Sequence, residues 1–297
     1  MKKILFILNL LLLAAIIALD VCLILSPSLA LKSVTSACFV LVGIINAAYA
    51  IKAGADKKFI IFMLVGLVFA MAGDIVNYNT DDIYFITGTA LFALAHVFYI
   101  VSYYFLCRFH LTDVIISACI FVPSALFITL APIFDFGGVL MEVVCIVYAL
   151  ILSVMVGKAL SNVRLRTDVS IIIAVGSILF FVSDLSLLLN MFGKMHTVPR
   201  ILCLATYYPA QFILAFSMFV YALRKGTEEK LGYADAGTTN SEPVLGNKAN
   251  LIKGDVKMSE VDIPTIIERQ REYFKSGVTL NAKHRLKYLK MLYSAIQ

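Results

Sequence analysis

The sequence predicts an all-α integral membrane protein, an eight-helix transmembrane bundle followed by a polar tail. Hydrophobic residues make up 61% of its 297 residues and charged residues only 15%, whereas soluble domains usually hold about 45–50% apolar and about 25% charged residues. The mean hydropathy is +0.92, so water cannot be the main solvent of this chain. The sequence after Leu223 is rich in Lys, Glu, Asn and Gly, and we expect this second region outside the membrane.

Eight apolar stretches are each long enough for one membrane span, which takes about twenty residues. They cover residues 4–25, 33–51, 59–78, 83–106, 111–131, 139–156, 169–191 and 201–223. The first stretch follows two lysines, as a secretory signal would, but it is too long for a signal core and no small-residue cleavage site follows it. We therefore expect it to remain as the first helix. The connections are short, so consecutive helices should run antiparallel.

Lys and Arg residues are distributed unevenly between the two ends of the predicted bundle. One set of helix ends carries Lys2, Lys3, Lys52, Lys57, Lys58, Arg108, Lys158, Arg164, Arg166, Arg224, Lys225 and Lys230. The opposite set carries only Lys32, Lys194 and Arg200. Because cytoplasmic loops retain these residues, we expect a multi-pass protein with both termini in the cytoplasm, in the cell membrane if the source is bacterial.

Two of the spans share a short pattern. Residues 66–74 read GLVFAMAGD and residues 176–184 read GSILFFVSD, so each has a Gly followed eight residues later by an Asp, with Phe between. A duplication into two parallel four-helix halves would explain the shared offset, as in other membrane folds. Chance similarity between two apolar stretches is the alternative.

Several polar residues lie inside the predicted spans, where an ionised side chain costs at least ~2.5 kcal/mol on insertion scales. Asp74 and Asp184 each lie fifteen residues after the start of their spans, so we expect both at one level. His96 extends toward that level from the fourth span. The other polar candidates near this layer are Asn77, Tyr99, Tyr207, Tyr208 and Gln211. We expect a working site here, the alternative being that these groups only bond helices to one another.

The residue types available at this layer favour acid–base chemistry without a metal or cofactor. The four histidines are too scattered for the usual zinc pattern, and phosphate-binding glycine motifs and the GxSxG motif are absent from suitable contexts. Nothing in the sequence indicates a nucleic-acid partner.

Five stretches of the membrane region carry a family resemblance. They are GLVFAMAGDIV (66–76), FITGTALFALAHVFYI (85–100), VYALILSVMVGKAL (147–160), GSILFFVSDLSLLLNMF (176–192) and ATYYPAQFILA (205–215). In their order and spacing, over about residues 33–223, they resemble the YhhN-like lysoplasmalogenase family. The family positions fall on Gly73, Asp74, Gly88, Phe92, Ala95, His96, Tyr99, Ser183, Asp184, Asn190, Tyr207, Ala210 and Gln211. The chain departs from the family at Ser33, where Lys-Pro is usual and this sequence has Lys-Ser.

The resemblance implies hydrolysis of the vinyl-ether bond of lysoplasmalogens, releasing a fatty aldehyde and a glycerophospho head group. Such a bond breaks when carbon is protonated and water captures the oxocarbenium ion, a division of labour that two carboxyl groups perform in glycosidases. Asp74 and Asp184, with His96, are then the catalytic candidates. Asn77, Tyr99, Asn190, Tyr207, Tyr208 and Gln211 are the substrate-binding candidates. The expected partners are a lysophospholipid and membrane lipids. The alternatives are a proton-coupled transporter and a non-catalytic lipid-binding protein.

The end of the chain carries a second resemblance. Residues 258–297, particularly RQREYFKSG and HRLKYLKML, resemble the opening segment of fatty-aldehyde-type aldehyde dehydrogenases. No nucleotide-binding motif follows, so the resemblance implies a truncated fusion and an aldehyde dehydrogenase as a partner. A basic cytosolic tail near anionic lipids is the alternative. The predicted organisation is a membrane hydrolase domain (1–225), a flexible linker (226–257) and a helical cytoplasmic tail (258–297).

The charge distribution generates a topology prediction. Reporters inserted after Arg224 or within residues 53–58 should be cytoplasmic, and a reporter within residues 79–82 should not, because Lys and Arg gather at the first two positions. Labelling of single introduced cysteines with an impermeant reagent, in intact and in permeabilised cells, measures this. Labelling of the first two positions in intact cells would contradict the orientation.

Overall fold

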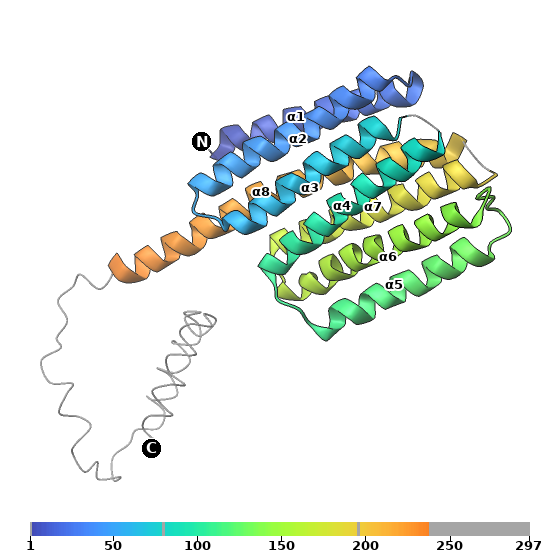
Figure 1. Ribbon diagram of the computed structural model, residues 1–297. Coiled ribbons are helices and arrows are strands. Elements are labelled where there is room, and N and C mark those ends of the chain that lie inside the picture. Colours follow the sequence, from blue (N-terminus) through green and yellow to red (C-terminus); the bar gives the residue numbers. More distant parts are fainter. Residues whose placement is uncertain (1, 79–80, 195–196, 238–297) are drawn as a thin grey trace, which may run out of the picture. The chain divides into compact units, whose positions relative to one another are not determined.

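The computed structural model describes residues 2–78, 81–194 and 197–237, and within them the chain forms eight long helices and one short 3₁₀ turn (Figure 1). The helices are α1 (Lys2–Leu25), α2 (Leu29–Lys52), α3 (Lys57–Val76), α4 (Asp82–Leu106), α5 (Leu111–Leu130), α6 (Val139–Asn162), α7 (Asp168–Phe192) and α8 (Thr197–Gly237), with η1 (Val163–Leu165) after α6. All eight long helices are long and apolar enough to cross a membrane. The predicted eight-helix membrane bundle is therefore confirmed.

Most helix ends lie within a few residues of the predicted ones, and three differ in ways that matter. α3 ends at Val76, so Asn77 is the cap of this helix and not part of its interior. α6 continues to Asn162, six residues beyond the predicted end. α8 continues to Gly237, so residues 226–237 of the predicted linker are helical. The remaining linker and the predicted tail, residues 238–297, lie outside the described residues.

The longer α6 is explained by a buried ion pair. Lys158, which the sequence placed at a cytoplasmic helix end, lies inside α6 with its side chain fully buried. Its Nζ donates to Oδ2 of Asp113 at 2.8 Å and to the carbonyl oxygen of Arg108 at 3.0 Å. Because these acceptors satisfy the ammonium group, the helix can carry this charge into the bundle.

The two halves of the bundle pack in the same pattern. In each half the first helix packs on the second, the second on the third and the third on the fourth. The fourth helix of each half then packs on the second helix of the other, α4 on α6 and α8 on α2. In Figure 1, α1 and α2 lie along one edge of the bundle and α5 along the opposite edge. This arrangement supports the predicted duplication into two parallel halves.

Close approach of α5 and α6 depends on a residue without a side chain. A Cβ added at Gly157 would lie 2.8 Å from the Cα of Ser117 on α5. Small residues allow backbones to approach in this way in membrane bundles, where packing replaces the hydrophobic effect as the driving force.

A pair of buried amides joins α1 to the rest of the bundle. Asn9 on α1 and Asn46 on α2 exchange hydrogen bonds, with N···O distances of 3.0 and 2.9 Å. Asn46 also donates to the carbonyl oxygen of Ala215 on α8 at 3.3 Å. Both amides are buried, so they link three helices where no water is available to replace the bonds.

This amide pair predicts a non-additive effect on stability. Replacing Asn46→Leu should lower the free energy of unfolding by about 1–2 kcal/mol, a typical range for polar contacts between membrane helices, because Asn9 is left without its partner. The double variant Asn9→Leu with Asn46→Leu should lose less than the sum of the single changes. Denaturant unfolding in detergent micelles measures both. Leu41→Ala, at an exposed position of α2, is the control, and strict additivity would contradict the prediction.

Candidate active site

Asp74, near the end of α3, is held by side chains from two other helices. Its Oδ2 accepts hydrogen bonds from Ser36 Oγ on α2 at 2.6 Å and from the Tyr207 hydroxyl on α8 at 2.7 Å. Lys32 on α2 lies close by, with 3.7 Å between its Nζ and Oδ1 of Asp74. The carboxyl group is buried, and these groups replace the water that it would bind outside the membrane.

Asp184, in the middle of α7, is also held from two other helices. Its Oδ2 accepts a hydrogen bond from the Tyr148 hydroxyl on α6 at 2.7 Å. His96 Nε2 on α4 lies 3.3 Å from the same oxygen and 2.8 Å from the Tyr148 hydroxyl. The His96 ring is fully buried and packs edge to face on Phe180, with 4.7 Å between centroids. The imidazole is therefore fixed against the carboxyl group.

The two carboxyl groups occupy equivalent places in the repeated packing. Asp74 on the third helix receives donors from the second helix of its own half and the fourth of the other. Asp184 on the seventh helix is contacted by side chains of α6 and α4, which are the corresponding helices. The contacting side chains differ, Ser and Tyr in one case and Tyr and His in the other. The helix packing around the two carboxyl groups is thus the same, and the groups that contact them are not.

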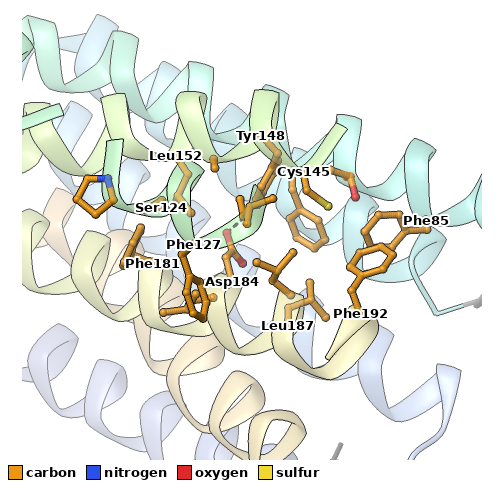
Figure 2. A pocket seen from close by; sticks show the side chains of 17 residues that line it. Phe85, Ser124, Phe127, Cys145, Tyr148, Leu152, Phe181, Asp184, Leu187 and Phe192 are labelled. Carbon is orange, nitrogen blue, oxygen red and sulfur yellow. Dashed lines mark hydrogen bonds between the residues drawn. The ribbon is translucent and has the colours of Figure 1, made fainter. Parts of the chain in front are cut away.

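An apolar cavity of about 260 Å³ lies beside Asp184. Its wall is formed by Phe85, Thr89, Phe92, Pro123, Ser124, Phe127, Ile128, Cys145, Tyr148, Ala149, Leu152, Phe181, Asp184, Leu185, Leu187, Leu188 and Phe192. Figure 2 shows the Asp184 carboxyl group among apolar side chains, with few other polar groups around the space. Such a lining suits a hydrocarbon chain.

A second cavity of about 210 Å³ lies at the distal end of the bundle, the end that carries the α1–α2, α3–α4, α5–α6 and α7–α8 connections. It is called the polar cavity because its wall includes the charged residues Lys32, Asp74, Asp184 and Arg200. Its wall is formed by Leu23, Pro27, Lys32, Asp74, Asn77, Tyr78, Phe92, Ser183, Asp184, Leu187, Asn190, Met191, Arg200, Cys203, Leu204 and Tyr207. Phe92, Asp184 and Leu187 belong to both walls. Asp184 therefore stands where an apolar space meets a polar one, and Asp74 faces only the polar space.

The structure brings most of the candidate residues together. Five of them line the polar cavity, and these are Asp74, Asn77, Asp184, Asn190 and Tyr207. His96 joins them through its contact with Asp184. The remaining three lie behind the cavity walls. Tyr99 donates to Oε1 of Gln211 at 2.8 Å, both side chains being fully buried, and the Tyr208 ring packs on Tyr207 with 5.0 Å between centroids.

Four residues of the site were not among the sequence candidates. Tyr148 and Ser36 supply hydrogen bonds to the two carboxyl groups, and Lys32 and Arg200 line the polar cavity. Tyr and Ser are common in membrane helices, so the sequence offered no signal for the first two. The sequence did offer a signal for Lys32 and Arg200, because basic residues are rare on the predicted non-cytoplasmic side.

The donor atoms at this site are those of acid–base chemistry. In the part of the chain that the structure describes, no cluster of three or more His, Cys, Asp or Glu side chains could hold a metal ion. Two carboxyl groups on one cavity can divide the donation and the acceptance of a proton between them. A molecule with one apolar chain and one polar end would place the bond between these parts at Asp184.

Comparison with known proteins covers the part of the chain that holds this site. The YhhN family model matches residues 30–218. Human lysoplasmalogenase TMEM86A is 28% identical over 159 residues, and the bovine lysoplasmalogenase TMEM86A is 30% identical over 162 residues. Each alignment covers 52% of this chain and 64% of the relative, so the chain spans less than two thirds of the curated relatives it matches. No solved structure matches the chain.

Proposed function

The chain belongs to the YhhN family, and from this we propose that it is an intramembrane hydrolase that cleaves the vinyl-ether bond of lysoplasmalogens, releasing a fatty aldehyde and a glycerophospho head group. The observation that carries the proposal is the position of Asp184, which lies on the walls of both the apolar and the polar cavity. The relatives named lysoplasmalogenase support the same class of substrate.

The two parts of the substrate match the two cavities, which share Phe92, Asp184 and Leu187 in their walls. Its single alkenyl chain enters the apolar cavity, and its glycerophospho head group enters the polar cavity. The vinyl ether lies between these two parts of the molecule, so it comes to rest beside Asp184. Binding energy from the chain and the head group then serves to hold the reacting bond in place.

The chemistry uses the two carboxyl groups in turn. Asp184 borders the apolar cavity, so it donates a proton to the vinyl carbon farther from the oxygen, leaving an oxocarbenium ion. Asp74 faces only the polar cavity, so it accepts a proton from the water that adds to the nearer carbon. The hemiacetal then returns its hydroxyl proton to Asp184 while Asp74 protonates the departing glycerol oxygen. Aldehyde and alcohol are formed, and both groups regain their starting states.

His96 and Tyr148 act through Asp184. Both lie within hydrogen-bond distance of Oδ2, which leaves Oδ1 to carry and deliver the proton. Their role is to fix the carboxyl group at the junction of the cavities, since a small misplacement of a catalytic group costs much of the rate.

Both termini are proposed to face the cytoplasm, and the tail beyond the membrane domain is proposed to deliver the aldehyde to an aldehyde dehydrogenase. The charge distribution and the resemblance of residues 258–297 support these two proposals.

Neutral replacement of either carboxyl group tests the mechanism. Asp74→Asn and Asp184→Asn should each lower turnover of a lysoplasmalogen by about 10²-fold or more, the usual scale for acid–base groups. Both variants should still bind a non-cleavable alkyl-ether lysolipid with an affinity close to that of the wild type. Aldehyde release by the purified protein is the measurement, and Asp168→Asn, an exposed position on α7, is the control.

Two outcomes contradict this mechanism. If both variants fold and keep near-normal aldehyde release, the two-carboxyl mechanism is wrong. Proton-linked uptake into vesicles without any covalent change to a lipid identifies a transporter instead.

Filling the apolar cavity tests where the chain binds. Ala149→Phe places a ring in this cavity, and it should lower kcat/KM for a long-chain substrate by about tenfold, a typical cost of overfilling a pocket. A substrate with a chain several carbons shorter should lose less. Val147→Phe adds the same ring at an exposed position of α6 and is the matched control. Equal loss with both chain lengths would place the chain elsewhere.

A further inference from the structure

Two basic side chains on the wall of the polar cavity have no place in the acid–base chemistry. The distal end of the bundle carries few Lys and Arg residues, and two of these, Lys32 on α2 and Arg200 on α8, line this one cavity. A cation on the wall of a membrane cavity is costly. The pairing of two such cations therefore needs a reason beyond helix packing.

Lys32 is only partly engaged by protein groups. Its Nζ lies 3.7 Å from Oδ1 of Asp74, at the long end of ion-pair contact. The side chain is 17% exposed, and it belongs to the wall of the cavity. An ammonium group held in this way has donors left for a second anion, since lysine carries three N–H bonds.

No carboxylate among the described residues forms an ion pair with Arg200. Its Nη2 donates to the carbonyl oxygen of Ile24 at 3.2 Å, which fixes the side chain against the end of α1. A guanidinium group presents several donors in a plane and binds two phosphate oxygens at once.

We propose that Lys32 and Arg200 form an anion subsite that binds the phosphate of the substrate head group. The inference rests on the proposed function and deepens it, because it assigns the part of the cavity that recognises a phospholipid. Asp74, which is a carboxylate in the proposed mechanism, lines the same cavity, so its charge opposes entry of a phosphate unless cations offset it. The subsite also sets the position of the vinyl ether, because the glycerol unit spans the distance from the phosphate to the bond beside Asp184.

Two substrates that differ only in the phosphoethanolamine group test the subsite. One is a 1-alkenyl-glycerophosphoethanolamine, and the other is the matching 1-alkenylglycerol. Arg200→Gln should raise KM for the first by about tenfold or more, the scale of one lost charge-assisted hydrogen bond, and should change kcat/KM for the second by less than about twofold. Arg200→Lys should recover part of the loss. The control is Lys194→Gln, an exposed cation at the same end of the bundle, which should leave both substrates unaffected.

Equal losses by Arg200→Gln with both substrates would overturn the subsite while leaving the hydrolase in place. Lys32→Gln should reduce turnover as well as affinity, because Lys32 also contacts Asp74. The subsite is therefore tested with the Arg200 variants.

Competition distinguishes the source of the phosphate. Glycerophosphoethanolamine should inhibit the wild type and should inhibit Arg200→Gln less. If inorganic phosphate inhibits equally well, the subsite binds free phosphate and is not selective for a head group, which also overturns the assignment.

A binding measurement separates failure of the subsite from failure of the proposed function. If the wild type releases no aldehyde from either substrate, the hydrolase proposal fails. Calorimetry with a non-cleavable alkyl-ether lysophospholipid and with the matching alkylglycerol then still decides the subsite. Weaker binding by Arg200→Gln of the phospholipid alone supports it, and equal binding by wild type and variant overturns it.

Discussion

A carboxyl group inside a membrane persists only where protein atoms replace the water that it has lost, and this requirement organises the bundle. An unsatisfied polar group in hydrocarbon costs several kcal/mol. Asp74 and Asp184 each meet the requirement with polar side chains from two other helices. Each carboxyl group therefore ties three helices together. The same contacts aim both groups at the polar cavity, so the interactions that stabilise the fold also build the site.

The elements that the sequence predicted well were those governed by hydrophobic length and by the cost of burying charge. The eight spans follow from apolar stretches of the right length, and Asp74, Asp184 and His96 were found because charged residues in such stretches are rare. The depth of a residue along a helix could also be counted from the sequence. The direction in which its side chain points around the helix could not be predicted. Tyr99 and Gln211 were therefore grouped with the cavity residues, although they bond to each other behind the cavity wall.

The residues that the sequence missed are explained by contacts between distant parts of the chain. Arg200 and Lys32 meet one cavity only because α8 packs on α2. Tyr148 becomes a donor to Asp184 only because α6 packs on α7. Lys158 misled the prediction of the end of α6 because its partner, Asp113, lies on another helix. In each case the missing information was a contact between residues on different helices, which local sequence patterns do not contain.

The apolar cavity beside Asp184 arises where the two halves of the bundle cease to be alike. In the first half, α1 packs on α8 as well as α2, and the buried pair Asn9 and Asn46 fixes it there. At the offset of 110 residues that relates Asp74 to Asp184, the corresponding residues are Cys119 and Val156, which cannot form such a pair.

Consistent with this, α6 is the only helix among the described ones whose backbone α5 approaches closely. The space that α1 fills in one half is therefore left open in the other, and it is lined by α4, α5, α6 and α7. Only one of the two carboxyl groups, that of Asp184, therefore borders an apolar cavity. In the proposed mechanism, this asymmetry lets Asp184 act on the hydrocarbon side of the reacting bond while Asp74 acts on the side of water.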